Sequence, residues 1–201
     1  MLFRSLNGVN GPFASTFGDL DGDGDPDMIT GSGDGKLYFF ENTAGPCAAV
    51  SFNLPTGNYK GIDVGNYSFP QLYDLDHDGL LDLIISNSFG LLKYFRNTGT
   101  STVSAFSITA TKDTLGGVIT QRTGFVNGNA CAVFYNDSGS EKLAVGTLDG
   151  KLYIYDNVAG NIFGNYHLAD SLINGEEGQN LVPAIGDLNN DGHPDMVIGN
   201  F

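Results

Sequence analysis

The sequence predicts an all-β fold built from repeated antiparallel units, and three observations carry this prediction. The 201 residues include 29 Gly, 14 Phe and 9 Tyr with only 16% charged residues, which is typical of short strands joined by tight turns. A nine-residue acidic loop occurs three times. Each loop is followed by a short apolar strand, and the first two apolar strands are followed by an aromatic one.

The strands of each unit are expected in the same order along the chain. A first strand precedes each turn, at 13–18, 67–73, 130–135 and 181–186. An apolar second strand follows at 27–31, 82–86, 142–146 and 195–199. An aromatic third strand follows at 36–42, 91–97 and 151–157, and a fourth has room at 50–54, 103–109 and 161–168.

Two features of the second and third strands support this order. The dipeptides Asp34-Gly35 and Asp149-Gly150 lie between them and favour the positive φ angles of a hairpin. No helix is expected after Gly33-Asp34-Gly35-Lys36, so a hairpin is favoured there over a phosphate loop. Recurring aromatic residues are expected to pack between units, namely Tyr38, Phe39, Phe40, Tyr94, Phe95, Tyr153 and Tyr155.

The period of the repeat predicts the architecture. Asp19 and Asp74 are 55 residues apart, and Asp187 follows after 113 residues, about two further periods. Four-stranded units at such a spacing predict a β-propeller in which each unit is one blade. Because propellers close with about four to eight blades, the three and a half to four blades of this chain are expected to be part of a larger ring, with a self-closed four-blade ring as the alternative.

We expect a single propeller domain over 1–201, with boundaries set by the loops. Its predicted parts are the outer strand of a preceding blade at 1–11, blades with an acidic loop at 12–60 and 61–118, a blade with a degenerate loop at 119–178, and the first half of another loop-containing blade at 179–201.

The acidic loops have the composition of calcium sites. Of the 23 acidic residues, 12 lie in the three loops, where they repel each other unless a cation lies among them. Side-chain oxygens at positions 1, 3, 5 and 9 and a carbonyl at position 7 suit Ca²⁺, with Gly at position 6 for the sharp turn. The expected ligands are Asp19, Asp21, Asp23, Asp25 (carbonyl) and Asp27; Asp74, Asp76, Asp78, Leu80 (carbonyl) and Asp82; and Asp187, Asn189, Asp191, His193 (carbonyl) and Asp195.

Two comparisons refine this prediction of three Ca²⁺ sites. An EF-hand needs a Glu at position 12 and flanking helices, whereas position 12 here is Thr30, Ile85 or Ile198 in strand-like sequence. The third repeat aligns Phe134, Asn136, Ser138, Ser140 and Lys142 with the ligand positions. We expect no Ca²⁺ there, with the Lys142 ammonium either in the place of the ion or facing solvent.

The loops and the residues before them resemble the FG-GAP/VCBS repeats of integrin α-type propellers. Phe17-Gly18 followed by Asp19–Asp27 matches the Phe-Gly opening and calcium loop of that family, whereas the second loop opens with Leu72-Tyr73. The resemblance implies a non-catalytic, calcium-stabilised propeller of a secreted or cell-surface protein, acting in adhesion, ligand binding or as a scaffold. It also leaves open a lectin or the propeller portion of a polysaccharide lyase or hydrolase.

Charge and composition limit the classes of partner that this chain is expected to bind. With 9 Lys+Arg against 23 Asp+Glu, no nucleic-acid-binding surface is expected, and no apolar run is long enough to cross a membrane. The expected partner is a protein or glycan on a propeller face, or a neighbouring domain.

No catalytic residue is expected, since His77, His167 and His193 have no adjacent nucleophile. Loops with Kd ~10⁻⁴–10⁻⁵ M would be filled only at extracellular calcium levels, which indicates an extracellular or surface location.

Overall fold

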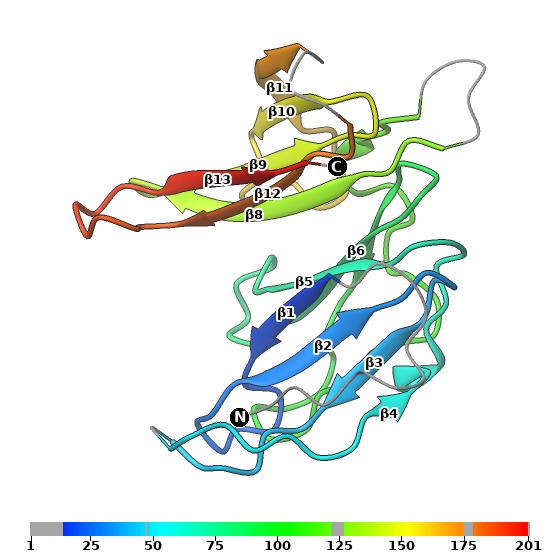
Figure 1. The fold of residues 1–201 in the computed structure, drawn as a ribbon, viewed down its shortest axis with the longest axis vertical. Coiled ribbons are helices and arrows are strands. Elements are labelled where there is room, and N and C mark those ends of the chain that lie inside the picture. Colours follow the sequence, from blue (N-terminus) through cyan, green and yellow to red (C-terminus); the bar gives the residue numbers. More distant parts are fainter. Residues whose placement is uncertain (1–13, 47, 122–126, 175–178, 201) are drawn as a thin grey trace.

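The chain is all-β in the computed structural model, which describes residues 14–46, 48–121, 127–174 and 179–200 (Figure 1). Within these ranges there is no α-helix, and the only helical elements are two short 3₁₀ turns, η1 (Tyr59–Gly61) and η2 (Leu115–Gly117). No helix in the described residues is long and apolar enough to cross a membrane. The outer strand expected at 1–11 lies outside the described residues.

The strands form four antiparallel sheets that follow one another along the chain. The first contains β1 (Ser15–Gly18), β2 (Asp27–Gly31), β3 (Leu37–Phe40) and β4 (Thr56–Gly57). The second contains β5 (Phe69–Tyr73), β6 (Asp82–Ser86) and β7 (Leu92–Phe95). The third contains β8 (Cys131–Asp137), β9 (Ser140–Gly146), β10 (Lys151–Asp156) and β11 (His167–Asn174), and the fourth contains β12 (Val182–Gly186) and β13 (Asp195–Gly199).

The strands predicted as first, second and third in their units lie close to where the sequence places them, but the predicted fourth strands do not. In the first sheet the fourth strand is β4, and 50–54 contributes only the isolated bridge between Asn42 and Phe52. In the second sheet 103–109 forms no strand, and Tyr94 instead bridges to Lys112. The prediction of four strands in every unit is therefore wrong for the second sheet as described. An outermost strand has a neighbour on one side only, so its sequence carries a weaker pattern than that of an inner strand.

The third unit shows the same kind of error. Its fourth strand, β11, begins at His167, whereas the prediction placed it at 161–168. Residues 161–164 instead form a turn in which the Gly164 N–H donates to the Asn161 carbonyl at 3.1 Å. The Asn161 side chain stabilises that turn by donating from Nδ2 to the carbonyls of Asn157 and Asn165, both at 2.9 Å.

The core lies between consecutive sheets. All five residues of β6 are buried, and their side chains alternate between the two faces of the sheet. Leu83 and Ile85 belong to the cluster shared with the first sheet, and Ile84 belongs to the cluster shared with the third. Of the seven recurring aromatic residues expected to pack between units, Tyr94, Phe95, Phe39 and Tyr155 lie in these clusters or against them, whereas Tyr38, Phe40 and Tyr153 do not belong to them.

The first strands of successive sheets are neighbours, since β1 contacts β5, β5 contacts β8 and β8 contacts β12. The turn between the second and third strands of each sheet also bonds to the start of the next sheet in the same way. Ser68, Ala130 and Leu181 donate their N–H groups to the carbonyls of Ser32, Asn87 and Thr147, at 3.0, 3.4 and 3.1 Å. Each sheet is thus joined to the next by an equivalent backbone bond.

Two of these junctions need a glycine at the end of the second strand. A Cβ added to Gly31 would lie 1.9 Å from the Ser68 carbonyl oxygen, and one added to Gly146 would lie 2.1 Å from the Leu181 carbonyl oxygen. Ser86 has the corresponding place in the second sheet, and its Oγ accepts a hydrogen bond from the Ala132 N–H at 3.2 Å. The glycines therefore serve the close approach of neighbouring sheets.

Replacing Gly31 by Ala is expected to lower the free energy of unfolding by about 2–3 kcal/mol, because the added methyl forces the Ser68 backbone to move. Urea denaturation followed by circular dichroism measures this loss. Gly186→Ala is the matched control, since no atom lies within 4 Å of the place that its Cβ would take, and its stability should change by less than about 0.5 kcal/mol. Equal stability of the two variants would contradict the close approach.

Candidate metal centres

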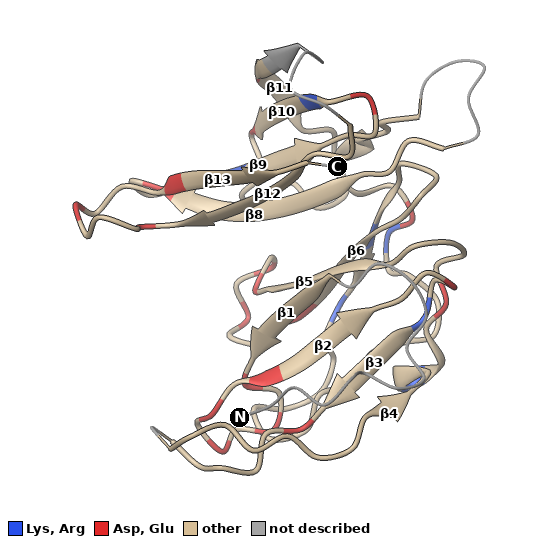
Figure 2. Cartoon of the chain, viewed as in Figure 1, with Lys and Arg blue, Asp and Glu red and all other residues tan. Residues whose placement is uncertain are grey.

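The three acidic loops occupy equivalent places, between the first and second strands of the first, second and fourth sheets. Figure 2 shows acidic residues gathered in the loops that join β1 to β2, β5 to β6 and β12 to β13, on the left of the view. Each loop begins directly after its first strand ends and closes with the Asp that opens the second strand. The register of the strand pair therefore holds the two ends of each loop together, as Gly18 pairs with Asp27 in the first sheet.

In two loops the structure brings three carboxylates to one point. Ligand atoms of Asp19, Asp21 and Asp23 all lie within 4.8 Å of one another, and those of Asp74, Asp76 and Asp78 do the same. Two oxygens bound to one Ca²⁺ at ~2.3–2.6 Å lie at most about 5 Å apart, so both clusters fit a single hard cation. Burial raises the pKa of Asp21, and its neighbours Asp23 and Asp19 add to that rise through charge repulsion.

Backbone N–H groups hold these carboxylates in one repeated pattern. The position 1 carboxylate accepts from the N–H of the position 6 glycine, at 3.0 Å in the first and second loops and 2.9 Å in the third. The position 5 carboxylate accepts from the N–H of position 7, at 3.0, 3.0 and 2.8 Å. The donors at position 6 are Gly24, Gly79 and Gly192, with φ between 85° and 87°, and those at position 7 are Asp25, Leu80 and His193.

The third loop follows the pattern with an amide in place of one carboxylate. Asp187 accepts from the Asp191 N–H at 3.1 Å, and Asn189 Oδ1 accepts from the same N–H at 2.9 Å. The Asn189 Nδ2 also donates to Asp191 Oδ2 at 3.0 Å. This loop thus presents two carboxylates and one amide oxygen where the others present three carboxylates. The negative charge that it offers to a cation is therefore smaller.

The position 9 carboxylates lie deeper than the other expected ligands and have structural partners. Asp27 is 0% exposed and accepts from the N–H groups of Leu20 at 3.2 Å and Asn42 at 2.9 Å. Burial raises the pKa of Asp27 to about 6, although these two hydrogen bonds act to lower it. Asp195 accepts from Leu188 N–H at 2.9 Å in the same manner. Position 9 therefore closes each loop, besides being an expected ligand.

Asp82 is the corresponding residue of the second loop and has one further partner. It is 0% exposed and accepts from the N–H groups of Leu75 and Asn97 at 3.2 and 2.8 Å and from the Tyr94 hydroxyl at 2.9 Å. Burial is the largest cause of its raised pKa. Asp82 thus connects the loop to the third strand of its own sheet.

Two asparagines that the sequence analysis did not assign to the site support the loops. Asn42 and Asn97 follow the third strands, are 2% and 3% exposed, and donate from Nδ2 to the position 8 carbonyls of Pro26 and Leu81, at 3.3 and 3.1 Å. Their counterpart in the third repeat, Asn157, is exposed and has a φ of 56°. The recurrence of Asn at this strand end was the signal for their role.

Arg96 is a second residue that the sequence analysis did not assign to the site. Its Nε lies 2.5 Å from Asp76 Oδ2, and its terminal nitrogen lies 3.0 Å from Asp78 Oδ2. The corresponding residue beside the first loop is Glu41, whose charge adds to the rise that burial causes in the pKa of Asp21. The guanidinium neutralises part of the charge of the second loop, so that loop is expected to hold Ca²⁺ more weakly than the first.

In the third repeat no acidic loop joins the first strand to the second, both of which are fully described. β8 and β9 are joined by the two residues Ser138 and Gly139, whose φ values of 53° and 88° fit a tight hairpin turn. Four of the five residues aligned with ligand positions are paired across this hairpin, and the fifth, Ser138, lies in its turn. Lys142 Nζ lies 2.6 Å from Asp137 Oδ2. Of the two alternatives for Lys142, a place like that of the ion is not seen, since no loop encloses the ammonium; its side chain is partly exposed at the surface and pairs there with a carboxylate of the facing strand.

The Asp25 side chain and two of the three histidines each have a partner outside the carboxylate clusters. The Asp25 side chain is 3% exposed and accepts from the Gly45 N–H at 2.5 Å; it is not one of the three carboxylates of the cluster, and the expected ligand of this residue is its carbonyl. His77 Nε2 lies 3.2 Å from Glu141 Oε1, and His167 Nδ1 lies 2.8 Å from Asp156 Oδ1. These two histidines contact carboxylates of neighbouring strands or sheets.

A comparison with protein-family models finds no match, and a search of curated proteins finds no relative. The resemblance to FG-GAP/VCBS repeats therefore stays a prediction from the loop motifs of the sequence.

Proposed function

We propose that this chain is a calcium-stabilised β-propeller of the FG-GAP/VCBS type, acting without catalysis in adhesion, ligand binding or as a scaffold. The observation that carries the calcium assignment is the equivalent hydrogen-bond pattern of the three loops, in which backbone N–H groups orient the side-chain oxygens of positions 1, 3 and 5. When bound, the ion would neutralise the repelling carboxylates and join the first strand of each sheet to the second.

The arrangement of the sheets supports the propeller part of the proposal. Successive sheets contact through their first strands, pack apolar residues between their faces, and repeat one backbone bond at each junction. Repetition of one junction is what a ring of blades requires. The second sheet, as described, has three strands, which a blade tolerates because its outermost strand is the one farthest from the axis.

The location follows from the strength expected of the loops. If the loops bind Ca²⁺ with Kd ~10⁻⁴–10⁻⁵ M, within the range known for acidic calcium loops, they fill only at calcium levels far above that of a cytosol. The proposed setting is therefore extracellular or on the cell surface, with a protein or glycan as the partner. Release of products from a polysaccharide panel by the purified chain would contradict the non-catalytic assignment.

A calcium count tests the proposal directly. Isothermal titration of the calcium-free chain is expected to find three sites, of which the first loop is the tightest and the Arg96-paired second loop is weaker. Asp19→Ala should remove one site, because it deletes the position 1 carboxylate of the first cluster. Lys142→Asp should leave the count at three, since the Ser138-Gly139 hairpin has no loop to close around an ion. Absence of calcium binding to the folded chain would overturn the proposal.

A further inference from the structure

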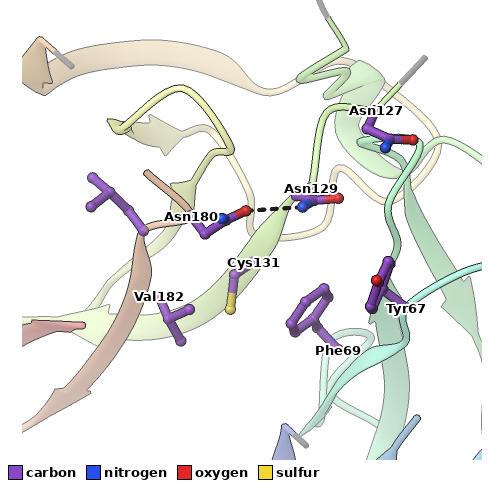
Figure 3. A pocket seen from close by; sticks show the side chains of 8 residues that line it. Tyr67, Phe69, Asn127, Asn129, Cys131, Asn180 and Val182 are labelled. Atoms are coloured by element: carbon purple, nitrogen blue, oxygen red, sulfur yellow. Dashed lines mark hydrogen bonds between the residues drawn. The ribbon is translucent and has the colours of Figure 1, made fainter. Parts of the chain in front are cut away.

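A pocket of about 420 Å³ lies where the first strands of the second, third and fourth sheets begin (Figure 3). Three consecutive sheets contribute to its wall, so no single repeat could form it. Acidic loops follow the far ends of two of these strands, β5 and β12, which places the pocket at the opposite end of their sheets from the candidate calcium sites. The lining residues are Tyr67, Phe69, Asn127, Asn129, Cys131, Asn180, Leu181 and Val182.

Three of the lining residues occupy equivalent positions in their repeats. Tyr67, Asn129 and Asn180 each precede the residue whose N–H joins its sheet to the previous one. All three have left-handed backbone conformations, with φ of 51°, 37° and 52°. Asn tolerates this region, whereas a bulky Tyr there is a rare outlier that concentrates at functional sites. The repeat thus presents one unusual backbone position to the pocket three times.

The chemistry of the wall is polar but uncharged. None of the lining residues named carries a charge, although the chain as a whole has a formal net charge of −14. Burial raises the pKa of the Cys131 thiol to about 12, so this group is neutral as well. Figure 3 shows the Phe69 ring and the Cys131 sulfur pointing toward the same space, which supplies an apolar floor.

Carboxamides supply the polar part of the wall. Asn129 Nδ2 donates to Asn180 Oδ1 at 2.9 Å, which joins two sheets at the rim of the pocket (Figure 3). The Asn129 Oδ1 atom is buried and has no hydrogen-bond partner among the described residues. A buried acceptor without a partner costs free energy, and a hydroxyl donor that reaches it after a small rotation of the side chain would recover that cost.

We propose that this pocket binds a neutral saccharide of one or two rings. A carboxamide both donates and accepts, as a sugar hydroxyl does, and the Tyr67 and Phe69 rings offer faces to the apolar side of a pyranose. The volume falls in the range of ~300–1,000 Å³ usual for small-ligand pockets. The absence of charge from the lining residues described disfavours acidic sugars and phosphates. This inference rests on the proposed ligand-binding function of the propeller. For the case in which the ligand is a glycan, it names the binding site and the class of ligand.

Saturation-transfer NMR on the whole calcium-loaded chain tests the proposal, with the methyl glycosides of glucose, galactose, mannose and N-acetylglucosamine as probes and methyl glucuronide as the charged comparison. At least one neutral glycoside is expected to bind, and the glucuronide is not. Asn180→Gly removes a pocket carboxamide while keeping a residue that accepts the φ of 52°, and it should weaken binding by about tenfold or more. Asn157→Gly makes the same change at a φ of 56° outside the pocket and should alter affinity by less than about twofold.

The outcomes separate this inference from the calcium assignment. Binding of a neutral glycoside that Asn180→Gly weakens would support the pocket, whatever the calcium count. Three calcium sites with no neutral glycoside bound would overturn the pocket and leave the calcium assignment standing. Equal affinity of the Asn180→Gly and Asn157→Gly variants, both shown to be folded by circular dichroism, would also overturn it, as would preferential binding of the glucuronide.

Discussion

Removal of calcium by excess chelator is expected to lower the free energy of unfolding of this chain by about 4–8 kcal/mol relative to 1 mM calcium. Each site with Kd ~10⁻⁴–10⁻⁵ M contributes about 1.4–2.7 kcal/mol at that concentration, because the ion binds the folded chain and not the unfolded one. Three sites together approach the total stability of a typical domain, about 5–15 kcal/mol. Urea denaturation followed by circular dichroism, with and without chelator, measures the difference.

The structure indicates why the effect should be large. Without an ion, three carboxylates in each of two loops have ligand atoms within 4.8 Å of one another, and their repulsion opposes the folded loop. Magnesium at the same concentration is the control, and it should restore less stability because it prefers a smaller and more regular oxygen shell. An unfolding transition that chelator leaves unmoved would contradict a stabilising role for calcium.

Replacing Asp82 by Ala is expected to lower the free energy of unfolding by about 3–5 kcal/mol even in excess chelator. The substitution leaves three donors without their acceptor in a fully buried place, namely Leu75 N–H, Asn97 N–H and the Tyr94 hydroxyl. Each unpaired buried donor costs about 1–3 kcal/mol. Part of this total cost is offset because the variant no longer buries the Asp82 carboxylate, which is itself unfavourable. Denaturation in chelator isolates this structural role from metal binding.

Two variants serve as controls for Asp82. Asp82→Asn keeps the shape and one acceptor oxygen, so its loss should be smaller than that of Ala. Asp113→Ala removes a carboxylate that is 74% exposed and pairs with Lys93 on the surface, and it should change stability by less than about 0.5 kcal/mol. Equal stability of Asp82→Ala and Asp113→Ala would show that the buried network does not support the loop.

The local parts of the fold could be predicted because their signals are local. The second strands at 27–31, 82–86 and 195–199 have the predicted bounds, since all of them are apolar runs bounded by an Asp and a small residue. The glycine turns between second and third strands also occur as expected, with φ of 81° at Gly35 and 74° at Gly150. Such turns depend on backbone angles that few residues other than Gly adopt.

The errors arose where the pattern depends on distant partners. The five positions that spacing aligns with the calcium ligands lie in a hairpin, four of them in its paired strands and Ser138 in its turn, so no nine-residue loop joins these two strands. The roles of Asn97 and Arg96 also could not be derived from spacing, because these residues lie 15 and 14 positions after Asp82 and reach the second loop only when the sheet forms.

The repeat, the acidic loops and the inner strands can be derived from the sequence, because each depends on neighbouring residues: the spacing of carboxylates, the glycine of a turn, a short apolar run. What surrounds these elements depends on the tertiary fold. Packing brings Asp82 into a buried network with three donors, pairs Arg96 with the second loop, and aligns Tyr67, Asn129 and Asn180 of three sheets around one pocket. The lining residues run from Tyr67 to Val182, 115 positions apart in the sequence, and only packing between sheets brings them to one pocket.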